Sequence, residues 1–161
     1  PVITTGKYTH KDSFVALYGK NPTRKELEYM SIEKHVTKEM PPCFIWQTAT
    51  DGTVPVQNSY LLAQKCLEEG VPFAHHVFSE GVHGMSVATE DWLERRGRET
   101  SFPKEMGEEL LVKNGIGRTQ PPKWTAEQKE EIRKTLKEVQ IWPKLAEEWL
   151  EKIIDYKGEA R

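Results

Sequence analysis

Apolar residues gather in two short runs in the first half of the chain, with a stretch of helical spacing between them. The run Cys43-Phe-Ile-Trp-Gln-Thr-Ala49 ends at Asp51-Gly52 and has the length and flanks of a buried parallel strand. In residues 56–69 the apolar positions recur at helical spacing, and Gly70 is suited to ending a helix. The run at residues 71–78 predicts a second strand. This strand–helix–strand order predicts an α/β fold with a parallel sheet and a right-handed crossover.

The residues before these runs have a weaker pattern. Pro1-Val-Ile-Thr-Thr5 is a β-branched run that predicts a strand, so the chain is expected to begin inside a central strand. Residues 6–21 have no sustained period and predict a loop with one helical turn. Thr23 and Glu26 form a capping box, which predicts the start of a short helix, and Ser31 is expected to start another helical turn.

The second half of the chain predicts helices and carries many charges. Residues 85–96 can begin a helix, and residues 97–140 are rich in Lys, Glu, Arg and Pro. Within this charged stretch, the helix 125–139, capped by Thr125, is expected to have a solvated surface. Residues 142–157 predict a closing helix that packs on the sheet, with Pro143 as an interruption before its amphipathic part. Three tryptophans are expected to dock these helices: Trp124, Trp142 and Trp149.

Composition limits the classes of partner. The chain has 161 residues, enough for one domain, but 37% hydrophobic residues is a low content, so its core is expected to be thin or shared with other polypeptide. The net charge is −2 with acids and bases interleaved, whereas a nucleic-acid partner usually needs a clustered basic face. No apolar run approaches the roughly 20 residues of a membrane span. We therefore expect neither a nucleic-acid nor a membrane partner.

The two cysteines, Cys43 and Cys66, do not make a disulfide framework. Both lie in apolar patterns and are interpreted as buried free thiols. Free thiols favour a reducing compartment, so we expect a cytoplasmic location.

Two residues follow the ends of the predicted strands, Asp51 after the first and His83 after the second. Taken singly, Asp51-Gly52 is a common turn and His83 is an ordinary loop histidine. The carboxyl ends of parallel strands meet at one edge of the sheet, so the two side chains are expected to lie together. A carboxylate that orients a histidine is the acid–base part of a catalytic triad, and Gly81 and Gly84 allow a tight turn around His83.

The other histidines and Trp46 have simpler interpretations. His75 and His76 are adjacent on a predicted strand and point to opposite faces. No Cys-x-x-Cys or His-Glu-x-x-His pattern accompanies them, so no metal and no cofactor are expected. His10 and His35 are interpreted as isolated surface residues, and Trp46 as a core residue rather than a substrate platform.

A set of local motifs together resembles the C-terminal half of bacterial α/β-hydrolases of the acetyl esterase and acetylxylan esterase type. The motifs are Pro1-Val-Ile-Thr4, Tyr29-Met-Ser31, Glu33-Lys-His-Val-Thr37, Pro41-Pro42, Phe44-Ile-Trp46, Thr48-Ala49, Asp51 with Val54-Pro-Val56 and Asn58-Ser59, Gly70-Val-Pro72, Gly81 and His83-Gly84. The resemblance covers residues 1–90 well and the closing helix moderately. Residues 97–140 are longer and more charged than the family pattern, and are interpreted as an insertion.

The resemblance implies that residues 1–161 are the C-terminal portion of one α/β-hydrolase domain, with Asp51 as triad acid and His83 as triad base. Family members carry the nucleophilic serine and an oxyanion-hole His-Gly-Gly motif upstream. This chain has no Gly-x-Ser-x-Gly elbow around any of its serines, which are Ser13, Ser31, Ser59, Ser79, Ser86 and Ser101.

The implied activity is hydrolysis of short-chain esters, such as acetyl groups on carbohydrate, through an acyl-enzyme. The fragment alone is expected to be inactive because the nucleophile and the oxyanion donors are missing. Its expected partners are a small ester substrate and either the missing N-terminal half or a second copy, paired at the open strand edge beside residues 1–5. Two alternatives stay open: a non-catalytic interaction module derived from a hydrolase, and a peptidase of the same superfamily.

Overall fold

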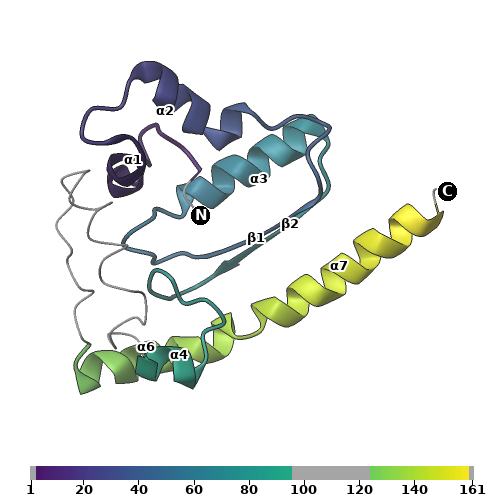
Figure 1. Cartoon of the computed structure of the whole chain (residues 1–161). Coiled ribbons are helices and arrows are strands. Elements are labelled where there is room, and N and C mark those ends of the chain that lie inside the picture. Colours follow the sequence, from purple (N-terminus) through teal and green to yellow (C-terminus); the bar gives the residue numbers. More distant parts are fainter. Residues whose placement is uncertain (1–2, 96–123, 160–161) are drawn as a thin grey trace, which may run out of the picture.

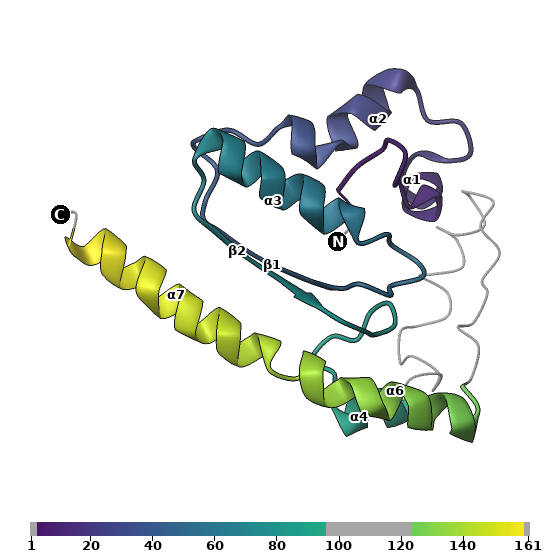
Figure 2. The ribbon, with the colours of Figure 1, turned by 180° about the vertical axis from the view of Figure 1, so that it is seen from behind.

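The computed structural model describes residues 3–95 and 124–159 of the chain (Figure 1). Two parallel strands lie between helices, with α3 on one face of the sheet and α7 along the other (Figures 1 and 2). In chain order the elements are α1 (Lys11–Tyr18), α2 (Arg24–Met30), the 3-10 turn η1 (Ile32–Lys34), β1 (Cys43–Thr48), α3 (Gln57–Glu69), β2 (Phe73–Phe78), α4 (Glu90–Arg95), α6 (Ala126–Val139) and α7 (Trp142–Glu159). None of the helices in the described part has the length and apolar character needed to cross a membrane.

The predicted strand–helix–strand unit is confirmed. β1 and β2 pair in parallel from Cys43 opposite Phe73 to Thr48 opposite Phe78, and α3 makes the crossover. Gly70 ends α3 in the left-handed conformation (φ 70°, ψ 22°), which glycine adopts without steric cost. The adjacent histidines of β2 do face opposite ways. The ring of His75 packs against that of Tyr60 on α3, with 5.6 Å between the ring centroids. The ring of His76 packs against that of Phe44, with 5.1 Å between the centroids.

Two apolar clusters hold these layers together. One lies between the sheet and α3 and consists of Ile3, Val36, Ile45, Leu62, Ala63, Cys66 and Val71. The other lies at the carboxyl end of β2, against α4 and α6, and consists of Phe78, Met85, Ala88, Leu93, Ile132, Leu136 and Val139. Burial of such side chains is the main favourable term in folding. The two clusters pack against opposite faces of the sheet, so the strands separate them.

The charged helix α6 is only partly the solvated helix that the sequence predicts. Its capping box, Thr125 with Gln128, begins the helix at the predicted place. However, Ile132, Leu136 and Val139 are buried against α4 and the end of β2, because they recur at helical spacing on one face. Ion pairs flank this buried face, from Lys129 to Glu94 and from Arg133 to Glu90 and Glu94. The solvated interpretation therefore holds for the outer face and is wrong for the inner one.

The N-terminal segment differs most from expectation. Residues 3–5 form no strand, so the predicted strand is wrong for the described residues, and residues 1–2 lie outside them. The backbone N–H groups of Ile3 and Thr4 donate instead to Oδ1 of the buried Asn58, at 2.9 and 3.1 Å. The loop predicted at residues 6–21 contains α1, an eight-residue helix rather than a single turn, whose Phe14 is buried. The capping box of Thr23 and the helical turn after Ser31 are confirmed.

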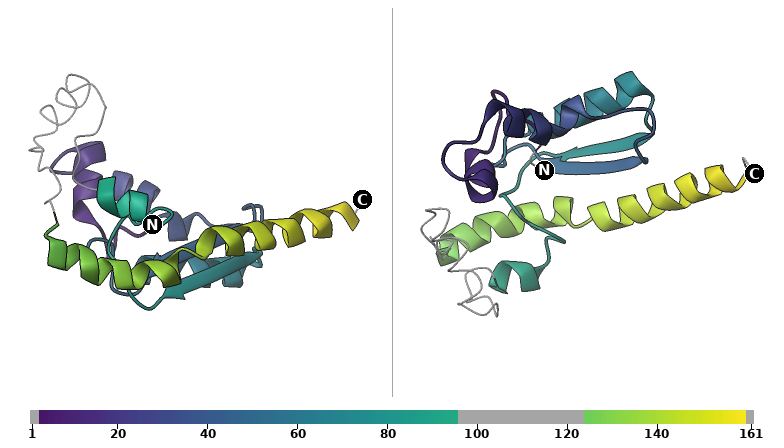
Figure 3. Two further views of the ribbon diagram at one scale, coloured as in Figure 1. Left: turned by 90° about the horizontal axis from the view of Figure 1, so that it is seen from below. Right: turned by 45° about the horizontal axis from the view of Figure 1, so that its top comes forward.

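The C-terminal helices follow each other end to end (Figure 3). Pro143 does not interrupt the chain before α7, because it lies in the first turn of that helix, where its missing N–H costs no hydrogen bond. The three tryptophans do dock these helices. Trp142 stacks on Trp46 at 5.1 Å, while Trp149 packs against Phe44 and Trp124 against Trp92. Most of the predicted charged insertion, residues 97–123, lies outside the described residues.

The two cysteines differ in burial. Cys66 is fully buried, and this burial, with a smaller effect from the neighbouring Cys43, raises the pKa of its thiol to about 11. Cys43 is only half-buried, so its prediction as a buried thiol is wrong in degree. It lies at the first position of β1, where the side chain is partly open. Both thiols are free.

Candidate active site

Asp51 lies in the turn that follows β1, and its carboxylate is held in one orientation. Oδ1 accepts hydrogen bonds from the backbone N–H groups of Thr53 and Val54, both at 2.9 Å. Oδ2 is 2.9 Å from Nδ1 of His83. Only 8% of the Asp51 side chain is exposed, against 44% for His83. The turn therefore aims a shielded carboxylate at an accessible imidazole.

His83 is carried by a turn that hydrogen bonds tie to the end of β1. The N–H of Gly81 donates to Oγ1 of Thr50 at 2.9 Å. The carbonyl of Gly81 accepts from the hydroxyls of Thr48 and Thr50, at 3.0 and 3.1 Å. Gly84, directly after His83, has φ 73°, a value that L side chains rarely adopt. The Asp51 loop and the His83 turn are thus bonded to each other at two places. One is the set of hydrogen bonds between Gly81 and the threonine hydroxyls, and the other is the bond between the Asp51 and His83 side chains.

The residues after His83 form a second, strained turn that the C-terminal helices hold. Ser86 and Ala88 have positive φ angles, 51° and 50°, which are uncommon for residues other than glycine. The carbonyl of Ser86 accepts from Nε1 of Trp142 at 2.8 Å, and that of Ala88 accepts from Nε2 of Gln140 at 2.7 Å. We call this turn, residues 85–89, with its two donors the brace of His83. It ties the histidine to the junction of α6 and α7.

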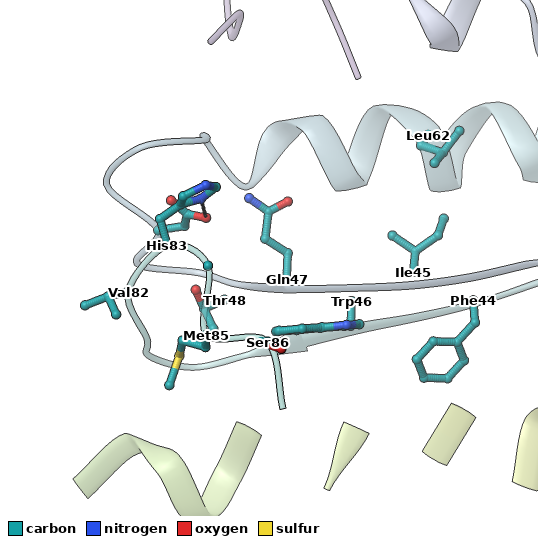
Figure 4. A pocket seen from close by; sticks show the side chains of 12 residues that line it. Phe44, Ile45, Trp46, Gln47, Thr48, Leu62, Val82, His83, Met85 and Ser86 are labelled. Carbon is teal, nitrogen blue, oxygen red and sulfur yellow. Dashed lines mark hydrogen bonds and ion pairs between the residues drawn. The ribbon is translucent and has the colours of Figure 1, made fainter. Parts of the chain in front are cut away.

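A cavity of about 430 Å³ lies beside the pair and runs along β1 (Figure 4). Ile45 and Gln47 line it on the α3 side, while Trp46 lies on the α7 side. Trp46 is half-buried and stacks on Trp142, so it both packs in the core and borders the cavity, where the sequence predicted a core role alone. Gln47 is buried and donates from Nε2 to the carbonyl of Val54, but its Oε1 has no hydrogen-bond partner among the described residues.

The geometry defines the chemical role that the pair can take. With Nδ1–H of His83 donating to Asp51, the basic lone pair lies on Nε2, the nitrogen that a hydroxyl would face. Ser86 lines the cavity beside His83 but lies in no Gly-x-Ser-x-Gly elbow, while three other serine hydroxyls of the described part are engaged elsewhere. Those of Ser31 and Ser59 donate to backbone carbonyls of Leu27 and Val56, and that of Ser79 is bonded to Glu138. The assignment of Asp51 and His83 as triad acid and base therefore stays a prediction, now with a geometry that suits it.

The sequence missed one neighbour of His83. The ring of His10 lies 6.5 Å from that of His83, with an angle of 24° between the ring planes, so its interpretation as an isolated surface residue is wrong. No local signal could have shown this contact, because it depends on how residues 3–10 are held over α3. His35 is exposed, as expected, and bonds through Nε2 to the carbonyl of Glu28. Within the described ranges no three His, Cys, Asp or Glu side chains are arranged to hold a metal ion.

Comparisons with known proteins place this geometry in context. No family model matches the chain. The endo-1,4-beta-xylanase B of Butyrivibrio fibrisolvens is 56% identical over 93 residues, which are 58% of this chain and 15% of that protein. The crystal structure of an acetyl ester-xyloside bifunctional hydrolase from Caldicellulosiruptor lactoaceticus matches with a TM-score of 0.52 and 33% identity, over 73% of this chain and 41% of that one.

Two further solved structures agree with the fold. A sugar hydrolase from Lactococcus lactis matches with a TM-score of 0.54 and 27% identity, over 84% of this chain and 40% of that one. A carboxylesterase from Lactobacillus plantarum WCFS1 matches 94% of this chain and 42% of its own length, with a TM-score of 0.54 and 23% identity. The chain thus spans less than half the length of each of these four proteins. It is a partial α/β-hydrolase that is similar to esterases of that fold.

Proposed function

We propose that the protein containing this chain hydrolyses short-chain carboxylic esters, with acetyl groups on carbohydrate as its substrates. The observation that carries the proposal is the 2.9 Å hydrogen bond between Oδ2 of Asp51 and Nδ1 of His83 at the carboxyl end of the sheet. The match to an acetyl ester-xyloside hydrolase and the local identity to a xylanase support the carbohydrate context. Asp51 acts as triad acid and His83 as triad base.

The reaction proceeds through an acyl-enzyme in two matching steps. A serine hydroxyl on polypeptide outside this chain attacks the ester carbonyl carbon, and Nε2 of His83 takes its proton. The bond between the carbonyl carbon and the alcohol oxygen then breaks, and His83 returns the proton to that oxygen. A water molecule repeats the sequence on the acyl-enzyme and releases the carboxylic acid. Asp51 holds the imidazole through Nδ1 and stabilises it while it carries the second proton.

The outer edge of β1 is the place where the remaining polypeptide docks. The N–H groups of Cys43 and Ala49 donate to carbonyls next to and within β2, at 3.0 and 2.8 Å. Because backbone groups alternate in direction along a strand, those of Phe44 and Trp46 point to the other edge. No strand of the described part pairs with that edge, and the cavity follows it. A strand paired at that edge would satisfy these backbone groups and cover apolar surface.

An apolar stripe on α7 extends the same surface. Trp142, which stacks on Trp46 at the cavity, also borders a shallow groove with Leu150 and Ile154. Leu150 and Ile154 are 49% and 66% exposed. Exposed apolar residues at helical spacing are typical of a helix face that packs against another surface. The edge of β1 and this stripe together form the surface that the other part of the α/β-hydrolase fold covers.

The purified chain is therefore expected to self-associate, because the edge of β1 and the apolar stripe of α7 can pack against the same surfaces of a second copy. Light scattering on a dilution series should give a mass above that of one chain, and Ile154→Asp should lower the association. Tyr29→Asp is the matched control, since Tyr29 is 72% exposed on α2, away from the surface, and should leave the mass unchanged. A monodisperse monomer at all concentrations would contradict the docking surface.

The function itself is tested on the complete polypeptide, with an acetylated xyloside and a peptide amide as substrates. We expect turnover of the ester, with a burst of alcohol release that marks the acyl-enzyme. Turnover of the amide alone would identify a peptidase of the same superfamily instead. Loss of both activities, together with the absence of a Gly-x-Ser-x-Gly elbow upstream, would identify a non-catalytic module derived from a hydrolase.

A further inference from the structure

His10 lies beside the proposed base although it is far from it in sequence. Its ring is stacked at 6.5 Å from the ring of His83, with 24° between the planes. Each of the two imidazoles is held through Nδ1: that of His83 by Oδ2 of Asp51 at 2.9 Å, and that of His10 by Oγ of Ser13 at 2.8 Å. The second histidine is thus oriented by a polar partner, like the first.

The start of α1 does not favour a histidine over other residues at this position. His10 is the N-cap of α1, but its side chain makes no cap hydrogen bond. Serine, threonine, aspartate and asparagine stabilise this position better, because their short side chains accept from the free N–H groups of the first turn. The hydroxyl of Ser13, one turn into the helix, is bonded to the His10 ring. This bond lies within the first turn of the helix, and it also orients the ring that faces His83.

The position of His10 is fixed by the loop that also carries Asp51. Asn58, in the first turn of α3 and fully buried, accepts from the N–H groups of Ile3 and Thr4. Its Nδ2 donates to the carbonyl of Tyr8 at 2.8 Å and to that of Pro55 at 3.0 Å. One buried side chain thereby ties the segment that leads to His10 to the segment that follows Asp51. The stacking of the two histidines follows from this tie, so it is built into the fold.

We propose that His10 determines specificity by binding a hydroxyl group on the alcohol part of the ester, next to the bond that breaks. This inference rests on the proposed function and narrows its carbohydrate substrates to those that carry a free hydroxyl next to the ester. The alcohol oxygen must come within hydrogen-bond distance of Nε2 of His83 to receive its proton. Substituents on the neighbouring carbon of that alcohol therefore lie close to the adjacent His10 ring. With the Ser13 hydroxyl donating to Nδ1, His10 offers its N–H at Nε2 as the donor.

The test compares two esters in the complete enzyme: a monoacetylated methyl xyloside, which has a hydroxyl next to the ester, and cyclohexyl acetate, which has none. His10→Phe keeps a ring that can stack on His83 and removes both nitrogens. We expect it to lower kcat/KM for the xyloside about tenfold, mainly through KM, since one hydrogen bond is lost. The value for cyclohexyl acetate should change less than about twofold, because that alcohol has no hydroxyl for His10 to bind.

Two further variants separate binding from a structural effect. Ser13→Ala leaves the His10 ring in place without its orienting partner and should give a smaller loss in the same direction. His35→Phe is the control, because His35 is exposed and lies outside the site. An equal loss on both esters, or no loss on either, would overturn the role of His10 while the proposed function stands. An enzyme that hydrolyses neither ester would overturn both.

Discussion

Replacing His83 with Ala in the complete enzyme is expected to lower kcat for acetyl-ester hydrolysis by about 10⁶-fold. Without the imidazole no group takes the serine proton or returns it to the leaving oxygen. Asp51→Asn should have an effect of about 10⁴-fold. The amide of asparagine can donate toward Nδ1 of His83, which favours the tautomer with its hydrogen on Nε2, the wrong nitrogen. The kcat and KM values of each variant, measured on one acetyl ester, check this expectation.

The controls for this pair use residues outside the site. His35→Ala removes an exposed imidazole and should leave kcat unchanged. Urea denaturation shows whether each variant is folded, because an unfolded protein would lose activity for a different reason. Loss of kcat with an almost unchanged KM is the expected pattern, since the pair acts on the transition state. If ester turnover survives in both Asp51→Asn and His83→Ala, the site assignment is wrong.

Gly81→Ala is expected to damage both stability and activity. A Cβ at Gly81 would lie 2.6 Å from Sδ of Met85 and 2.6 Å from Cγ2 of Thr48, and the backbone has φ 155° there. Overpacking of a buried site of this kind typically costs about 1–3 kcal/mol in the free energy of unfolding. The turn must move to relieve the contacts, and it carries His83, so kcat/KM should fall by about 10²-fold as the base leaves its position.

Gly52→Ala is the matched control, since it lies in the neighbouring turn and an added Cβ would meet nothing within 4 Å. Its effect on unfolding should stay within about 0.5 kcal/mol. Urea denaturation and ester kinetics on both variants give the comparison. Equal behaviour of Gly81→Ala and Gly52→Ala would show that the tight contact around Gly81 does not position the histidine.

Local patterns were sufficient where the determining groups are close in sequence. The capping box of Thr23 and Glu26 involves residues of one helical turn, and it begins α2 as predicted. Gly70 ends α3 because its own backbone angles require glycine. The proximity of Asp51 and His83 also followed, because parallel strands bring their carboxyl ends to one edge whatever the side chains are.

The remaining features depend on contacts that no local pattern carries. Ile3 has the β-branched side chain of a strand residue, yet its N–H donates to Asn58, which is 55 residues away. The same asparagine places His10 beside His83, so both errors have one cause. At α7 the sequence misplaced the start of the amphipathic helix, which begins before Pro143 rather than after it. Pro143 marks an interruption inside a helix but is tolerated in a first turn, and the position of that turn was set by the stacking of Trp142 on Trp46.

The brace of His83 has a consequence for the order in which the protein is synthesised. Its two donors, Gln140 and Trp142, are 52 and 56 residues beyond the carbonyls that they hold. A ribosome therefore makes the turn of the proposed base well before the groups that keep its strained backbone in place. During translation Asp51, whose own contacts at Thr53 and Val54 are immediate neighbours, reaches its final geometry early. His83 becomes fixed only when the last helices have emerged, so the nascent chain gains its acid first and its base last.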